Sequence, residues 1–278
     1  MRLGVHVPRF GLDVGRLPVN YAVTQMFTPN DFFAPFSATA INKAYKPGVD
    51  ALRLSFGLGQ LSSLDVVGVF NPDWAEVALL ARPSVVLWGV EWAALGGKLA
   101  ERWVAGASLQ GDAGPIGLRA EGHVGFPDRD GDGLVPGEDV HVRVAAGPNV
   151  NFDWQSAMLG AEYAFFSDGT LDPADYIARF GRRFPDDLPY LGKHYVGLVA
   201  GLETVPTLRL ATTGLVNAGD GSGLVGLSAL YSVADEADLL LGGFVPWGRD
   251  PVLGPSPALR SEFGASPLTI YLESRVFF

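Results

Sequence analysis

Strict alternation of apolar and polar residues dominates the chain, and the last stretch, PLTIYLESRVFF at 267–278, shows it most clearly. One face of this stretch would carry Leu268, Ile270, Leu272, Val276 and Phe278, and the other face would carry Thr269, Tyr271, Glu273, Arg275 and Phe277. A side-chain period of two over such a length indicates a β-strand. A tilted strand needs about 9 to 11 residues to cross a bilayer, so we expect a strand of membrane-spanning length here.

The same division recurs in two segments further upstream. In 116–126 the apolar positions are Ile116, Leu118, Ala120, Val124 and Phe126, and the opposite positions are Arg119, Glu121 and His123. In 140–146 three valines and an alanine alternate with His141 and Arg143. Each segment therefore has one face suited to lipid and one suited to water.

Fifteen segments of this kind follow one another, and no comparable amphipathic helix interrupts them. They are 2–7, 9–17, 49–58, 63–70, 75–82, 84–93, 101–111, 115–126, 139–147, 155–166, 194–204, 206–216, 223–232, 237–247 and 267–278. The pattern predicts an all-β fold over 1–278, a single transmembrane antiparallel up-and-down β-barrel of about 14 to 16 strands. Successive connections alternate between short turns and mostly longer loops. The long ones, 18–48, 127–138, 167–193 and 248–266, all fall on one side, which we expect to be extracellular.

A soluble β-sandwich would also alternate, but its apolar face would be a shared core and its polar face would meet water. The membrane barrel is favoured because charged residues repeat on the face opposite the apolar one, as a polar lumen requires. Aromatic residues also gather at segment ends, as interfacial girdles require: Phe70, Trp74, Trp92, Trp103, Phe126, Trp154, Phe165, Phe166, Tyr195, Trp247 and Phe278.

Composition narrows the possible functions. Mean hydropathy is +0.21, yet no apolar run is long enough for a membrane-spanning helix. The net charge of −10 and the scattered basic residues give no footprint for nucleic acid. The chain has no cysteine, which excludes disulfides and thiolate metal sites.

The closing YLESRVFF resembles the C-terminal signature of Gram-negative outer-membrane proteins, in which Ile270, Leu272, Val276 and Phe278 fit and Ser274 departs. That resemblance implies recognition by the β-barrel assembly machinery. LDVGR at 12–16, FTPNDFFAPF at 27–36 and PGVDALRLSFGLG at 47–59 are similar to the N-terminal half of porin-like barrels related to the alginate-export family. The likeness implies a channel in the outer membrane of a Gram-negative bacterium, surrounded by outer-membrane lipids and lipopolysaccharide.

Strand parity adds an expectation about the N-terminal end. Bacterial single-chain barrels have an even number of strands with both termini in the periplasm. Fifteen segments, and an opening MRLGVHVPRF without an export signal, predict that an N-terminal strand and a signal peptide are lacking. A miscount by one near AEVALLARPSVVLWGVEW would remove the argument about the strand but not the one about the signal.

The stretch FPDRDGDGLVPGED at 126–139 resembles a calcium loop of the EF-hand type. The candidate ligands are Asp128, Asp130, Asp132, the Leu134 carbonyl and Asp139, with Gly133 at the turn. Asp139 is shorter than the usual glutamate, and strands rather than helices flank the loop. Two interpretations stay open: a solvated acidic hairpin loop, or a loop that calcium orders. No other cofactor is required.

If the hairpin around this loop is centred on Asp132, His123 faces His141 and Glu121 faces Arg143. Outer-membrane proteases place Asp and His pairs near the mouth in a similar way. The chain shows no nucleophile motif, so the hydrated wall of a pore is favoured over a hydrolase, and we assign no catalytic residue.

The stretch LDPADYIARFGRRF at 171–184 predicts a short helix, with Asp172 as N-cap and Pro173 at its first position. If this loop folds inward, Arg179, Arg182 and Arg183 would narrow the pore. Alternatively, the loop covers the rim.

These observations predict a channel for passive diffusion of small hydrophilic solutes. The expected pore-lining residues are Arg53, Glu91, Arg102, Arg119, Glu121, His123, His141, Arg143, Glu162, Arg209, Glu273 and Arg275. The alternative is a non-conducting binding or surface-display barrel, plugged by 18–48 and 167–193 and ordered at its rim by calcium.

Overall fold

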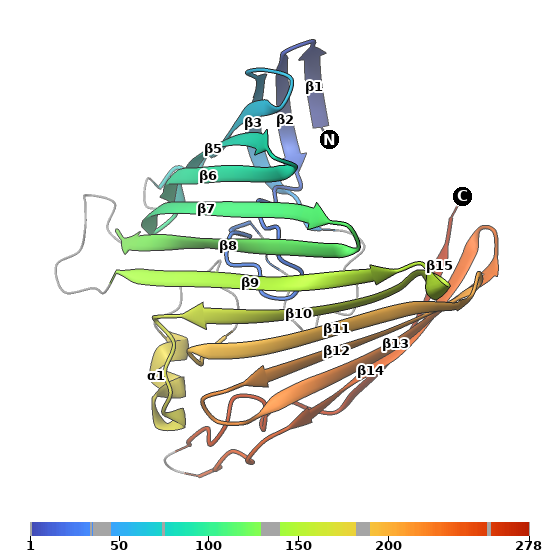
Figure 1. The fold of residues 1–278 in the computed structure, drawn as a ribbon. Coiled ribbons are helices and arrows are strands. Elements are labelled where there is room, and N and C mark those ends of the chain that lie inside the picture. The colour runs from blue at the N-terminus through green and yellow to red at the C-terminus, as the bar shows by residue number, and fades with distance from the viewer. Residues whose placement is uncertain are drawn as a thin grey trace.

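The computed structural model describes residues 2–33, 35, 46–73, 76–128, 140–181, 190–254 and 257–277. It contains a single 15-stranded antiparallel sheet in which each strand pairs with its neighbours in sequence (Figure 1). The strands are β1 (Arg2–Val7), β2 (Phe10–Leu17), β3 (Val49–Gly57), β4 (Ser62–Val69), β5 (Ala78–Leu87), β6 (Val90–Leu99), β7 (Arg102–Ala113), β8 (Ile116–Pro127), β9 (His141–Phe152), β10 (Ala157–Phe166), β11 (His194–Val205), β12 (Leu208–Asn217), β13 (Gly223–Ala234), β14 (Ala237–Trp247) and β15 (Thr269–Val276). The all-β, up-and-down fold predicted from alternation is confirmed.

The predicted boundary between 75–82 and 84–93 is wrong. Pro83 lies inside β5, and the hairpin turns instead at Trp88 and Gly89, whose φ angles are 55° and 78°. Two successive residues with positive φ suit a two-residue hairpin whose twist matches the strands. The paired residues of β5 and β6 skip from Ala81 to Ser84 on β5, so the missing N–H of Pro83 falls where the ladder is interrupted.

The sheet curls into a trough that surrounds the segment 18–33, with β1 and β15 at its two edges (Figure 1). We call the face toward this segment the inner face and the opposite face the outer face. Two short 3₁₀ turns, η2 (Trp154–Ser156) and η3 (Pro173–Asp175), and one helix, α1 (Tyr176–Gly181), complete the described elements. No helix in the described ranges is long and apolar enough to cross a membrane.

Connections at one end of the sheet are short and those at the other end are mostly long. On what we call the turn side lie 8–9, 58–61, 88–89, 114–115, 153–156, 206–207 and 235–236. On the loop side lie 18–48, 70–77, 100–101, 128–140, 167–193, 218–222 and 248–268. The prediction that the four long loops share a side is therefore confirmed.

Apolar side chains are exposed on the outer face and packed on the inner one. Leu268, Ile270, Leu272 and Val276 are 64 to 75% exposed. The buried apolar residues form two clusters between the sheet and the segment 18–33, one around Phe32 and Phe33 and one around Phe27. An exposed apolar face is the reverse of a soluble sandwich and matches a lipid-facing barrel wall. Of the expected aromatic girdle, Trp74 and Phe278 lie outside the described residues, and the prediction is wrong for Phe166 and Tyr195, which are buried on the inner face.

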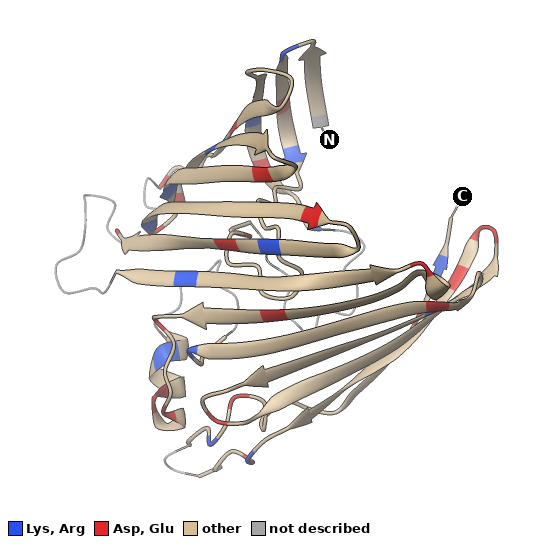
Figure 2. Ribbon diagram, viewed as in Figure 1, with Lys and Arg blue, Asp and Glu red and all other residues tan. Residues whose placement is uncertain are grey.

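Charged residues divide the sheet into two regions (Figure 2). They are found along the inner face from β2 to β10, whereas β11 to β15 carry them only near the turn side, at Glu203, Arg209, Asp238, Glu273 and Arg275. The rest of the C-terminal wall is uncharged.

Candidate functional site

The strand pairs place all twelve expected pore-lining residues on the inner face. Glu91, Arg119, Arg209, Glu273 and Arg275 lie toward the turn side, Arg53, Glu121 and Glu162 lie near mid-height, and Arg102, His123, His141 and Arg143 lie toward the loop side. That these residues line a pore stays a prediction. The structure also places the segment 18–33 in the space that these twelve residues face. The prediction did not include this segment among the pore-lining residues.

Glu162 on β10 holds the middle of this inward segment. Its Oε1 accepts a hydrogen bond from the backbone N–H of Gln25 at 2.5 Å, and its Oε2 accepts from Met26 at 2.8 Å and Phe27 at 3.1 Å. Glu162 is buried. One carboxylate therefore satisfies three consecutive backbone donors that no regular secondary structure satisfies.

Glu121 on β8 pins the segment on either side of that point. Its Oε2 accepts from the N–H of Val23 at 2.5 Å and its Oε1 from the N–H of Asn30 at 3.2 Å. The Asn30 amide donates to the Ala107 carbonyl at 3.1 Å, and its Oδ1 lies 3.2 Å from Nδ1 of His123. The inward segment is thus fastened to β7, β8 and β10.

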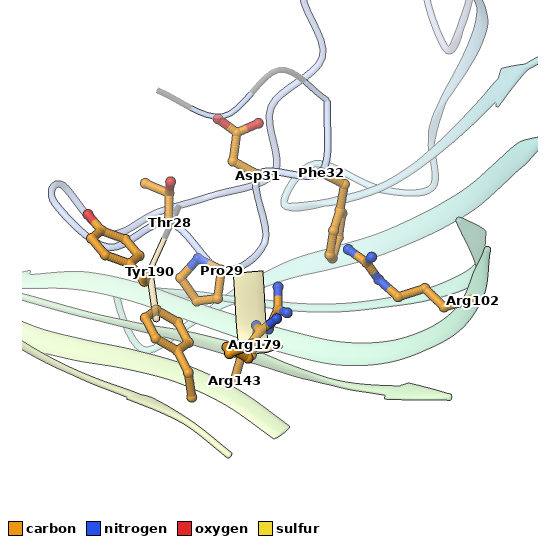
Figure 3. A pocket seen from close by; sticks show the side chains of 9 residues that line it. Thr28, Pro29, Asp31, Phe32, Arg102, Arg143, Arg179 and Tyr190 are labelled. Atoms are coloured by element: carbon orange, nitrogen blue, oxygen red, sulfur yellow. The ribbon is translucent and has the colours of Figure 1, made fainter. Parts of the chain in front are cut away.

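A small cavity remains where the inward segment approaches the loop side (Figure 3). It is lined by Thr28, Pro29, Asp31, Phe32, Arg102, Arg143, Phe166, Arg179 and Tyr190. Three arginines thus come from β7, β9 and α1, and the inward segment supplies the opposite wall. The cavity measures about 10 Å³, roughly the space of one water molecule.

Asp168 joins two of the three arginines. Its Oδ2 lies 2.6 Å from a guanidinium nitrogen of Arg143 and 2.6 Å from one of Arg179. Burial alone would raise the pKa of Asp168, but the two cations outweigh it and hold the pKa below its ordinary value. The bridge fixes α1 against the inner face of β9.

Asp31 forms an ion pair with Lys46, which precedes β3. Burial raises the pKa of Asp31 and lowers that of Lys46, although each partner opposes the effect on the other. The pair therefore ties the two described parts of the 18–48 connection together at the edge of the cavity.

Ion pairs between close neighbours line the inner face from mid-height to the turn side. They are Arg53–Asp65 at 2.7 Å, Arg82–Glu91 at 2.7 Å, Glu203–Arg209 at 2.6 Å and Glu273–Arg275 at 2.9 Å. All these side chains are at least partly exposed. Five of the expected pore-lining residues thus have their charge compensated locally, and this region forms a hydrated wall.

The predicted helix in the β10–β11 connection is confirmed in its described part. The Asp172 side chain accepts from the N–H of Ala174 at 2.9 Å, with Pro173 at the first position of η3, and α1 follows directly. Arg179 of α1 lies at the cavity. Arg182 and Arg183 lie outside the described residues.

Of the proposed calcium ligands, the described residues include Asp128 alone. Its buried carboxylate accepts a hydrogen bond from Nε1 of Trp103 at 2.9 Å. Asp130, Asp132 and Asp139 lie outside the described residues. In the part of the chain that is described, no three carboxylate or imidazole groups are placed to hold a metal ion. Calcium binding remains a prediction.

The expected pairing around the acidic loop is wrong by two residues. His123 pairs with Arg143, His141 with Gly125 and Glu121 with Ala145. Because a shift of two keeps every side chain on its face, the histidines still face inward, with ring centroids 5.8 Å apart. The observed register suits the residues that it pairs, because the His141 imidazole lies across Gly125, where a Cβ would approach it to 2.2 Å.

Of the residues that resemble the assembly signal, Ile270, Leu272 and Val276 point outward from the edge strand β15 and are highly exposed. Phe278 lies outside the described residues. Their role in assembly stays a prediction.

No family model matches the chain, and no curated protein matches it. Solved structures do match. Wzi, a carbohydrate-binding β-barrel of the outer membrane involved in group 1 capsule assembly in Escherichia coli, superimposes with a TM-score of 0.58 at 11% identity, over 90% of this chain and 66% of Wzi. OccK10 (OpdN) of Pseudomonas aeruginosa gives a TM-score of 0.54 at 10% identity, over 88% of this chain and 77% of OccK10. OccAB4 of Acinetobacter baumannii gives 0.53 at 10% identity, over 98% and 74%. The chain therefore has the fold of porin-like outer-membrane β-barrels.

Proposed function

We propose that this protein is a channel in the outer membrane of a Gram-negative bacterium, through which small hydrophilic solutes diffuse passively. The observation that carries the proposal is the inward segment 18–33, which Glu121 and Glu162 hold across a charged inner wall. A segment of this kind narrows a barrel and sets the size and charge of what passes. The porin-like fold and the apolar outer face support it.

The charge at the cavity favours anionic over cationic solutes. Arg102, Arg143 and Arg179 all line the gap, where Asp168 bridges Arg143 and Arg179. Guanidinium groups that line a narrow passage raise the local concentration of anions there. No chemical step is required of any residue.

The test is single-channel recording of the refolded chain in a planar bilayer, with a salt gradient to measure ion preference. Discrete conductance steps with anion preference are expected, and Arg102→Gln should move the reversal potential toward that of cations. Arg249→Gln, the same change at an exposed position of the β14–β15 connection, should leave the potential unchanged. Equal shifts in both variants would contradict the assignment of selectivity to the cavity.

A non-conducting binding or surface-display barrel is the second candidate. It is favoured by the size of the cavity, about 10 Å³, and by the likeness to a carbohydrate-binding barrel. A folded, membrane-inserted protein that never conducts would support this alternative against the channel. Contacts with lipopolysaccharide and with the assembly machinery belong to both candidates.

Calcium would order the rim in either candidate. If it binds the acidic loop, Asp130→Asn combined with Asp132→Asn should abolish calcium-dependent protection of 128–140 from proteolysis. Absence of any protection in the unchanged protein would contradict calcium binding.

A further inference from the structure

Connections on the loop side converge on Glu262, which lies between β14 and β15. Its Oε1 accepts a hydrogen bond from the N–H of Leu191, in the β10–β11 connection, at 2.9 Å. Its Oε2 accepts from the Tyr195 hydroxyl of β11 and from the Asn217 amide of β12, the latter at 2.6 Å. One side chain therefore joins one long connection to another and to two strand ends.

Asp220, in the β12–β13 connection, extends the same network. Its Oδ2 accepts from the N–H of Glu262 at 2.7 Å and from the hydroxyl of Tyr176 on α1 at 2.8 Å. Its Oδ1 accepts from the N–H of Ser222 at 2.7 Å. The two carboxylates together connect the three loop-side connections 167–193, 218–222 and 248–268.

Within the described ranges, no cationic side chain is paired with either carboxylate, Glu262 or Asp220. Among the described residues, the titratable groups that face Glu262 are Asp220 and three tyrosines, Tyr176, Tyr190 and Tyr195. A buried carboxylate beside a second carboxylate disfavours its charged form. Burial raises the pKa of Glu262 to about 7, and the charge of Asp220 adds to this, against the hydrogen bonds from Tyr195, Leu191 and Asn217.

The network also supports the inward segment. The Tyr195 ring lies 5.8 Å from that of Phe27 and 4.8 Å from that of Tyr190, which itself lies 5.6 Å from Phe27. Phe263, next to Glu262, belongs to the same buried cluster. A change in the network therefore acts on the part of the molecule that holds Phe27 in place.

We propose that Glu262 and Asp220 form a proton-dependent latch, which fastens the three loop-side connections while the pair holds a proton and loosens when both carboxylates are ionised. The latch stands on the contacts above. Only its consequence, easier opening of the constriction at higher pH, rests on the proposed channel function.

The direction follows from linkage between protonation and folding. Glu262 binds its proton more tightly when the latch is closed than when it is open, where the pKa has its ordinary value of 4.5. The extra stability of the closed form is therefore fully present below pH 4.5. It falls as the pH rises to about 7 and is constant above. Each pKa unit corresponds to a factor of ten, so the equilibrium constant for opening of the latch should rise by up to about 300-fold over this whole window.

Hydrogen exchange of the full chain in detergent micelles, read by mass spectrometry and corrected for intrinsic exchange rates, tests the latch. Between pH 5 and pH 8 the protection of 190–195, 217–222 and 260–264 should fall by about 10-fold to 100-fold. Glu262→Gln, which imitates the protonated form, should stay protected at both values. Glu236→Gln, the same change at an exposed position of the β13–β14 turn, should behave like the unchanged protein.

Equal protection at both pH values, or an unaltered pH dependence in Glu262→Gln, would overturn the latch. If that variant does not fold, the unchanged protein decides: a midpoint between pH 5 and pH 8 that is confined to these three segments supports the latch, and a uniform change over all strands overturns it. The readout needs no conductance. A silent barrel with pH-dependent loops would therefore contradict the proposed channel and leave the latch standing.

Discussion

The turn side and the loop side of the inner face use carboxylates in different ways. Near the turn side, Glu203 and Glu273 pair with arginines six and two residues away, in contact with water. At mid-height and toward the loop side, Glu121 and Glu162 are buried and Glu262 is largely shielded from water, and all three accept backbone N–H groups from segments that are 71 to 137 residues away. Similar side chains are thus a hydrated wall in one region and structural anchors in the other.

The two kinds of carboxylate differ in what happens to their partner groups when the carboxylate is removed. An exposed ion pair contributes little, because water replaces each partner. A buried carboxylate that satisfies several backbone donors leaves those donors without partners when it is removed, and each buried unsatisfied donor is costly. The comparison therefore predicts large effects for the anchors and small effects for the wall.

The largest effect is expected for Glu162→Leu. It leaves the N–H groups of Gln25, Met26 and Phe27 without their acceptor, which should cost about 3 kcal/mol or more in the free energy that keeps the segment closed. Hydrogen exchange of 23–30 measures this local opening directly. The matched change on the turn side, Glu203→Leu, should alter exchange there by less than about 1 kcal/mol, and equal effects would contradict the comparison.

A smaller effect is expected for Asp168→Asn, which removes the bridge between Arg143 and Arg179. Because the site is partly exposed to water, the cost to the docking of α1 should be about 2 kcal/mol. The folded-state pKa of Asp168 is depressed, so its contribution is present above its ordinary value of about 3.9 and is lost as the pH falls through the folded-state value.

The measurement that checks this sign is the extent of cleavage at Arg179 after brief exposure of the protein to trypsin, followed as the pH is lowered. Cleavage should rise at low pH in the unchanged protein and should be raised already at pH 7 in Asp168→Asn. Loosening with increasing pH instead would show that the Glu262 network, whose expected pH dependence has the opposite sign, controls α1.

The features that could be predicted from the sequence are those that depend on neighbouring residues along the chain. Alternation identified all fifteen strands because the lipid-facing and lumen-facing positions of a barrel differ at every step, and the N-cap at Asp172 needs only its neighbours. The role of Glu162 could not be predicted in this way, because its three donors are backbone groups more than 130 residues away. Backbone donors leave no residue-type signal in a sequence.

The misplaced turn in β5–β6 has a similar cause. A proline usually marks a strand end, but Pro83 lies where the ladder with β6 is interrupted, and the turn residue Trp88 is not a residue type that favours positive φ.

Gly89→Ala should lower the free energy of unfolding by about 1 kcal/mol, because alanine disfavours a φ of 78°. Thermal unfolding would measure it. Gly114→Ala, at a φ of 63° in the β7–β8 turn, should give a similar loss, and a loss for only one of them would contradict a purely conformational cause.

The smallest effect is expected for Arg209→Ala on the turn side. The Arg209 side chain is 65% exposed and that of Glu203 is 32% exposed, so water replaces each partner and the loss should stay below about 0.5 kcal/mol. Urea unfolding in micelles, at low and at high salt, would measure it. A loss above about 2 kcal/mol that salt does not reduce would mean that the turn-side pairs also anchor the barrel. The inner face would then be one continuous structural network rather than a hydrated wall beside an anchored inward segment.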